Sequence, residues 1–125
     1  MDHVVVSTPD PERAAALYGA RLGLDMALDR SHPDWGRLMF FRCGDLIVEV
    51  THRPGKQTRM TSQDRLRGLC WRVADIDATH ARLAAGAAST SRKSAPAASR
   101  ARGCMTVRSG TCGVPTLLVQ PSAEP

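Results

Sequence analysis

Two side chains that can do chemistry lie within segments whose other residues are typical of buried strands. His3 immediately precedes the β-branched run Val4–Val6, and Glu49 lies inside the otherwise apolar segment 46–50. With the two-residue period of a strand, each of them faces away from the valines beside it. An acid among apolar residues usually has an assigned partner. Imidazoles and carboxylates are each suitable ligands for a divalent metal, and a carboxylate can also act as a general base.

Each of these two residues also has a structural interpretation. His3 can be a strand-end histidine that pairs with Glu49 or with water, and Glu49 can be an exposed carboxylate at a strand edge. No Cys–His or Ser–His–Asp arrangement can be placed in the sequence, and no glycine-rich segment has the spacing of a phosphate loop.

The elements that must position these residues occur in the same order twice. A helix is expected over residues 13–21, after Asp10 as N-cap and before Gly23, and a second over 78–85, before Gly86. Strands are expected over residues 3–6, 24–28, 36–42, 46–51, 68–73, 104–107 and 116–119. Residues 53–65 are polar and contain Pro-Gly, so they predict a linker between a first unit 1–52 and a second unit 66–121. The sequence therefore predicts one α+β domain, 1–125, built from two units.

One stretch, residues 86–105, breaks this regularity. It shows no period of 2 or 3.6 residues and has the composition of a linker. The second sheet is expected either to lose a strand there or to build it from Ala, Ser and Arg, which bury little apolar area. One explanation is a compensated pair of frameshifts in the gene, which resequencing would test.

Charge and cysteine usage exclude several classes of function. The net charge is +5, but residues 86–105 alone supply +4 through Arg92, Lys93, Arg100 and Arg102, and no aromatic residue there could stack on a base. We therefore expect no nucleic-acid partner, and no membrane partner because no apolar run approaches about 20 residues. Cysteines 43, 70, 104 and 112 form no CxxC pair, so they predict reduced thiols in a cytoplasmic protein.

The ordered segments resemble the vicinal oxygen chelate superfamily, which includes glyoxalase I, extradiol dioxygenases and bleomycin-resistance proteins. The resemblance is carried by residues 2–6 (Asp-His-Val-Val-Val), 9–18, 22–24, 46–50, 68–77 and 113–118. It is closest to the glyoxalase-like branch. It implies two βαβββ units that form a cupped mixed sheet around a metal or a small ligand. Residues 86–105, which the resemblance does not cover, make the second unit irregular.

In that family, one residue from each of four strands holds the metal. His3 matches the first position and Glu49 the second, and the family's unit places these two strands side by side. The matching positions in the second unit are Gly68 or Leu69 and then Leu118 or Gln120, which offer no comparable ligand. The resemblance therefore implies an incomplete site for one divalent ion (Zn, Ni, Mn or Fe), with Glu49 as the catalytic candidate.

Three further residues, Arg72, Cys70 and Phe41, are candidate ligand contacts. Arg72 and Cys70 share a strand face with Gly68, and if that face lines the cup, Arg72 favours an anionic ligand; the alternative is a surface salt bridge.

The expected function is glyoxalase-like binding of a small organic ligand, as a metal-dependent lyase or dioxygenase. The alternatives are a non-catalytic sequestering protein of the resistance type and a degenerate, inactive member. A homodimer is expected because pairing would cover the exposed edges of a small sheet.

Overall fold

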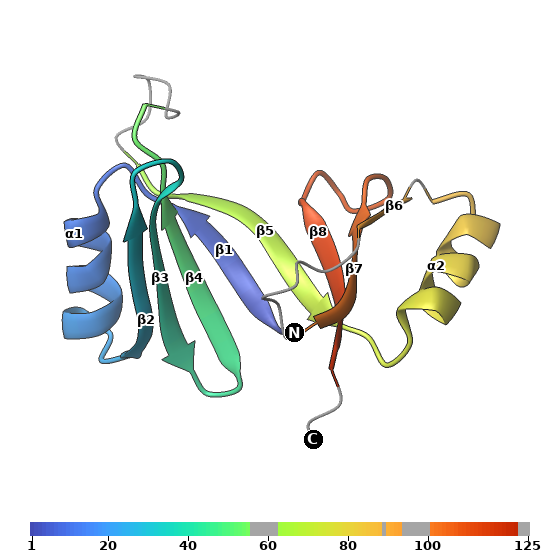
Figure 1. Cartoon of the computed structure of the whole chain (residues 1–125), viewed down its shortest axis with the longest axis horizontal. Helices are drawn as coiled ribbons and strands as arrows, with labels where there is room; N and C mark the ends of the chain where they lie inside the picture. Colours follow the sequence, from blue (N-terminus) through green and yellow to red (C-terminus); the bar gives the residue numbers. More distant parts are fainter. Residues whose placement is uncertain (56–62, 89, 94–100, 123–125) are drawn as a thin grey trace. The chain divides into compact units, whose positions relative to one another are not determined.

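The computed structural model describes residues 1–55, 63–88, 90–93 and 101–122. By its contacts the chain divides into two compact units, Asp2–Arg67 and Gly68–Pro125, the latter grouped with Met1. Each unit has the element order βαβββ, with one helix against a mixed four-stranded arrangement (Figure 1). The predicted α+β class and the two βαβββ units are confirmed.

The first unit contains β1 (His3–Ser7), α1 (Pro11–Ala15), the π-helical turn η1 (Ala16–Arg21), β2 (Asp25–His32), β3 (Gly36–Cys43) and β4 (Leu46–His52). Its strands lie in the order β2-β3-β4-β1, with β1 parallel to β4 and the other pairs antiparallel. The helix begins at Pro11, two residues before the predicted start, and its N-cap is Asp10 as predicted, because the side chain of Asp10 accepts a hydrogen bond of 3.0 Å from the N–H of Arg13.

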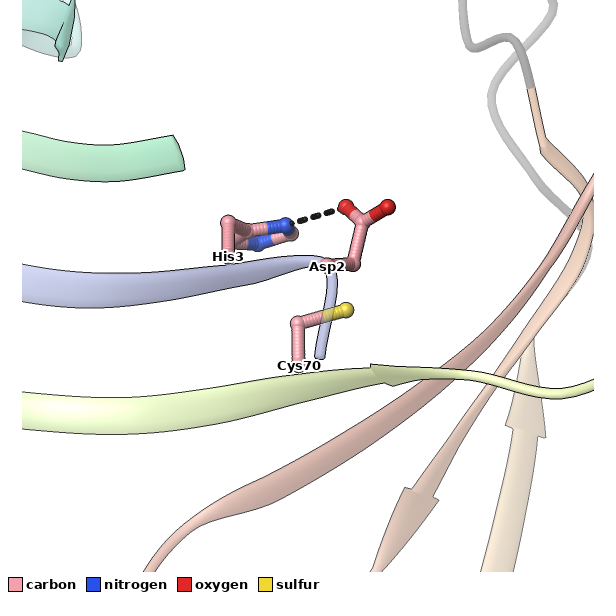
Figure 2. Close-up of side chains that lie close together, drawn as sticks. All are labelled: Asp2, His3 and Cys70. Atoms are coloured by element: carbon pink, nitrogen blue, oxygen red, sulfur yellow. Dashed lines mark hydrogen bonds and ion pairs between the residues drawn. The ribbon is translucent and has the colours of Figure 1, made fainter. Parts of the chain in front are cut away.

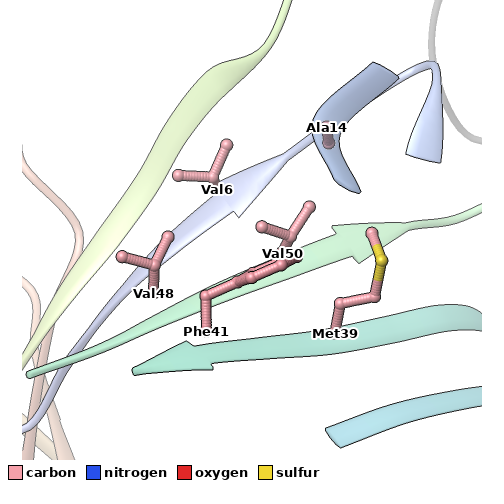
Figure 3. Close-up of a cluster of buried hydrophobic side chains, with 6 residues drawn as sticks. All are labelled: Val6, Ala14, Met39, Phe41, Val48 and Val50. Carbon is pink, nitrogen blue, oxygen red and sulfur yellow. The ribbon is translucent and has the colours of Figure 1, made fainter. Parts of the chain in front are cut away.

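A compact core lies between α1 and the sheet of the first unit (Figure 3). Alternate residues of β3 and β4 supply most of it, because successive side chains of a strand point to opposite faces. Its buried members are Val6, Ala14, Met39, Phe41, Val48 and Val50. The other face of these strands is therefore the one available for a ligand.

The second unit contains β5 (Arg65–Arg72, which begins in the first unit), α2 (Ile76–Ala85), β6 (Thr90–Lys93), β7 (Ala101–Val107) and β8 (Thr116–Pro121). The strand order is β5-β8-β7-β6, with β5 parallel to β8. Its core lies between α2 and the strands, and consists of Ile76 of α2 with Met105, Val107 and Leu118. Both units thus pair their first and last strands in parallel.

The stretch 86–105 does contain strand structure. β6 pairs with β7 from Thr90 opposite Val107 to Lys93 opposite Cys104. The strand is therefore retained, as a short one of four residues built from Thr, Ser, Arg and Lys. Residues 89 and 94–100 lie outside the described residues, as do 56–62 of the predicted linker.

Among the described residues, none of the helices has the length and apolar character that crossing a membrane requires.

Candidate functional site

His3 and Glu49 come from two adjacent parallel strands of the first unit. β1 and β4 are in register with Val5 opposite Glu49, so His3, two residues before Val5, shares its face with Glu49. This face is opposite to the α1 core, in which the neighbouring Val48 and Val50 are buried. The two side chains meet there, with Nε2 of His3 3.4 Å from Oε2 of Glu49.

A third polar side chain, that of Asp2, contacts the other nitrogen of the His3 ring. Its Oδ2 lies 2.7 Å from Nδ1 of His3 (Figure 2). An ionised carboxylate only accepts hydrogen bonds, so Nδ1 is the donor. In a neutral imidazole, Nε2 then keeps its lone pair on the side of Glu49. Sequence reasoning missed Asp2, because two consecutive residues of an ideal strand point to opposite faces, whereas Asp2 precedes the strand.

The side chains of Asp2, His3 and Glu49 are largely shielded from solvent, with exposed fractions of 26%, 19% and 21%. Burial raises the pKa of Glu49 above its ordinary value; the neighbouring His3 lowers it again in part, and the negative charge of Asp2 adds to the increase. A carboxylate that is costly to ionise gains most from a cation placed beside it. The array therefore favours a cation next to Glu49.

Phe41, a ligand contact in the sequence analysis, lies in the core instead. It is fully buried, opposite Val48 on β4, and its ring centroid is 5.6 Å from that of Tyr18. Phe40, its neighbour, lies opposite Glu49 and shares the face of the polar array. The alternation of β3 therefore gives Phe40 the position predicted for Phe41.

Cys70 and Arg72 lie on β5 in the second unit, in register with Leu117 and Val119 of β8. Leu118, between these two, belongs to the α2 core, so Cys70 and Arg72 lie on the face opposite to α2. Cys70 is 1% exposed, whereas Arg72 is exposed. The two candidates thus share a face of their unit, as the alternation of the strand predicts.

The positions considered for further metal ligands in the second unit have other roles. Leu118 is a core residue, and Oε1 of Gln120 accepts a hydrogen bond of 3.0 Å from the N–H of Ile76 at the start of α2. At Gly68, a Cβ atom would lie 2.9 Å from the carbonyl oxygen of Pro115, so a side chain does not fit there without a shift. None of these three positions supplies an imidazole or a carboxylate.

The donors of the first unit fit a divalent cation as two of its ligands. Imidazole nitrogen and carboxylate oxygen both bind Zn, Ni, Mn and Fe. Two ligand atoms bound at about 2.1 Å to a tetrahedral ion lie about 3.4 Å apart. Nε2 of His3 and Oε2 of Glu49 are separated by 3.4 Å. Catalytic sites usually have three protein ligands, so an ion on this pair would leave more positions open to water or to a ligand.

Comparison with known proteins gives a family and a fold. The model of the Glyoxalase/Bleomycin resistance protein/Dioxygenase superfamily matches residues 1–104. No curated protein matches the sequence.

Among solved structures, the methylmalonyl-CoA epimerase of Mycobacterium tuberculosis is 20% identical, with a TM-score of 0.74 over 97% of this chain and 87% of that one. A hypothetical protein from Bacillus halodurans is 10% identical, with a TM-score of 0.78 over 100% of this chain and 96% of that one. A variant of the Streptomyces coelicolor methylmalonyl-CoA epimerase, solved with 2-nitronate-propionyl-CoA, is 16% identical, with a TM-score of 0.74 over 99% and 97%. At these identities the likeness shows the fold.

Proposed function

Because the chain belongs to the Glyoxalase/Bleomycin resistance protein/Dioxygenase superfamily, we propose that it binds a small organic ligand at a divalent metal held by His3 and Glu49. The observation that carries the proposal is the approach of Nε2 of His3 to Oε2 of Glu49, at 3.4 Å, on the sheet face opposite to α1. The epimerases that share the fold, one of them solved with an acyl-CoA ligand, support a ligand rich in oxygen atoms.

In this proposal the residues of the first unit have distinct tasks. Nε2 of His3 and the carboxylate of Glu49 hold the ion, which when bound supplies a Lewis acid for an oxygen atom of the ligand. Phe40, opposite Glu49, supplies apolar surface against the carbon part of the ligand. In the metal-free protein, burial makes Glu49 a stronger base than an exposed carboxylate. Proton transfer from the ligand to Glu49 is therefore the role it could have when no ion occupies its carboxylate, whereas with the ion bound Glu49 serves as a ligand.

A second candidate function is non-catalytic sequestration of a small molecule. It is favoured by the second unit, where Leu118 packs in the core and Gln120 bonds to α2, so neither adds a metal ligand. A two-ligand metal site binds more weakly than a three-ligand one. A protein that only binds its ligand needs no such site.

The test is the metal content of protein purified without chelator. We expect close to one equivalent in the wild type, and its loss when His3→Ala and Glu49→Ala are combined. The matched control is His80→Ala, which removes a histidine from α2 in the other unit and should keep the metal. If the wild type takes up no Ni²⁺, Zn²⁺, Mn²⁺ or Fe²⁺ even in excess, the metal-dependent function is wrong and sequestration is favoured.

We also propose that the protein is a cytoplasmic homodimer. Strand β2 is the edge strand of the first unit, and most of its residues are exposed. A second copy of the chain could pair with this edge. Sedimentation velocity at several concentrations measures this directly, and a monomer at every concentration would contradict it.

A further inference from the structure

We propose that Asp2 is a positioning residue, which holds the imidazole of His3 in the tautomer whose unprotonated nitrogen faces Glu49. The inference rests on the proposed function, since Nε2 of His3 can bind a metal ion only when it carries no proton. It also predicts a property of the metal-free protein, because the tautomer of a histidine is measurable without any ligand.

The imidazole of His3 makes two contacts of unequal length. Oδ2 of Asp2 lies 2.7 Å from Nδ1 of His3, whereas Oε2 of Glu49 lies 3.4 Å from Nε2. A neutral imidazole carries a single N–H, so the two carboxylates compete for one donor. The shorter contact has the length of a charge-assisted hydrogen bond, and the longer one is at the limit of hydrogen bonding. Asp2 therefore takes the proton-bearing nitrogen, and the lone pair is left on the side of Glu49.

The same contact restrains the orientation of the ring. His3 and Asp2 are both largely buried, with exposed fractions of 19% and 26%. Histidines that bind metals commonly donate their second N–H to a carboxylate or a carbonyl, and loss of that partner typically costs about 10–100-fold in affinity. Asp2 places such a carboxylate at Nδ1 of His3 before any ion is present.

Two other histidines provide internal references for the tautomer. Nδ1 of His52 lies 2.9 Å from the carbonyl oxygen of Thr8, which only accepts, so the neutral ring carries its proton on Nδ1. Nδ1 of His32 accepts from the N–H of Asp34 at 3.1 Å, so the neutral ring carries its proton on Nε2. The chain thus contains one reference for each tautomer.

The first experiment records long-range ¹H–¹⁵N spectra of the metal-free, histidine-labelled protein at about pH 8.5, two units above the ordinary imidazole pKa of about 6.5. In the wild type we expect the proton of His3 on Nδ1, as in His52. In Asp2→Ala, where Nδ1 loses this acceptor, we expect His3 to move to the Nε2–H form and donate to Glu49. Asp2→Asn keeps an acceptor oxygen and should restore the Nδ1–H form.

Controls separate this role from damage to the fold. The tautomer of His52, in the same unit, should be unchanged in every variant. Asp34→Ala removes an exposed carboxylate 3.7 Å from His32 and should leave His3 unaffected. If His3 keeps the Nδ1–H form in Asp2→Ala while His52 is unchanged, the assignment of Asp2 is wrong.

The second experiment is a Zn²⁺ titration of the same proteins. We expect Asp2→Ala to bind about 10–100-fold more weakly than the wild type and Asp2→Asn to recover most of the loss. Unchanged Zn²⁺ affinity in Asp2→Ala would overturn the link between Asp2 and the metal. If the wild type binds no Zn²⁺ or other divalent ion, the proposed function fails, and the spectra still decide whether Asp2 sets the tautomer.

Discussion

The face assignment of β3 can be tested by truncating its two consecutive phenylalanines. Phe41 is fully buried, its ring centroid is 5.6 Å from that of Tyr18, and its Cε1 lies 3.6 Å from where a Cβ of Gly19 would be. Phe41→Ala would leave a cavity lined by these groups, at a typical cost of about 3–5 kcal/mol in the free energy of unfolding. For a chain of this length, that lowers Tm by about 10–20 °C.

Phe40→Ala is the matched substitution on the opposite face. Phe40 is half-buried and faces the same side as Glu49, so we expect a cost below about 2 kcal/mol. The assay is urea unfolding of the metal-free proteins, followed by titration of the folded variants with Zn²⁺ and with candidate ligands. Phe41→Ala should leave the metal affinity of the folded protein unchanged, whereas Phe40→Ala should weaken ligand binding. A loss below about 1 kcal/mol in Phe41→Ala, with weakened ligand binding, would refute the assignment of the faces.

Three further substitutions test the electrostatics and backbone of the first unit. Because burial raises the pKa of Glu49, the metal-free protein should lose stability as pH rises from the ordinary glutamate pKa through the raised one. Glu49→Gln should remove this loss, and it should therefore raise Tm at pH 7. The same substitution should abolish metal uptake. Gly36 has φ +92°, and its Cβ would lie 1.9 Å from the carbonyl oxygen of His52, so Gly36→Ala should cost more than about 2 kcal/mol in urea unfolding. Arg37 lowers the pKa of Asp29, so the pair stabilises the fold above the ordinary aspartate pKa and this contribution disappears as pH falls through the lowered value. Arg37→Gln removes the ion pairs of Arg37 with Asp29 and with the exposed Glu12, so it should cost less than about 1 kcal/mol at pH 7, and nothing at a pH at which both carboxylates are protonated.

Much of the fold was predictable because local signals and long-range packing agree in this chain. The Asp10 cap, followed by a proline, is a local feature, and the side chain of Asp10 does accept from the helix. The alternation of β4 predicts that Val48 and Val50 are buried away from Glu49, and both lie in the α1 core. The β6 strand could not be predicted, because Thr90–Lys93 has no apolar alternation and its pairing with β7 is a tertiary interaction.

The candidate site was predictable only in part. The alternation of each strand predicts the faces on which His3 and Glu49 lie. That β1 and β4 are neighbours is implied only by the family resemblance, and their parallel register is a finding of the structure. The contact of Asp2 with His3 could not be predicted, because Asp2 precedes β1 and the alternation of side chains along a strand does not apply to it. The prediction for Phe41 is wrong because β3 places Phe40, not Phe41, on the face of Glu49, and this depends on the pairing of β3 with β4.

The difference between the two units explains why this fold can be retained while its chemistry changes. In each unit the helix-facing residues form the core: Val48 and Val50 in the first, Met105 and Leu118 in the second. The residues on the opposite face of the strands are not needed for that packing. In the second unit, β8 places Leu117 and Val119 opposite Cys70 and Arg72 on this face. The unit nevertheless forms the same βαβββ arrangement as the first. Fold similarity alone consequently does not predict a metal reaction, and the Asp2–His3–Glu49 array has to be tested by itself.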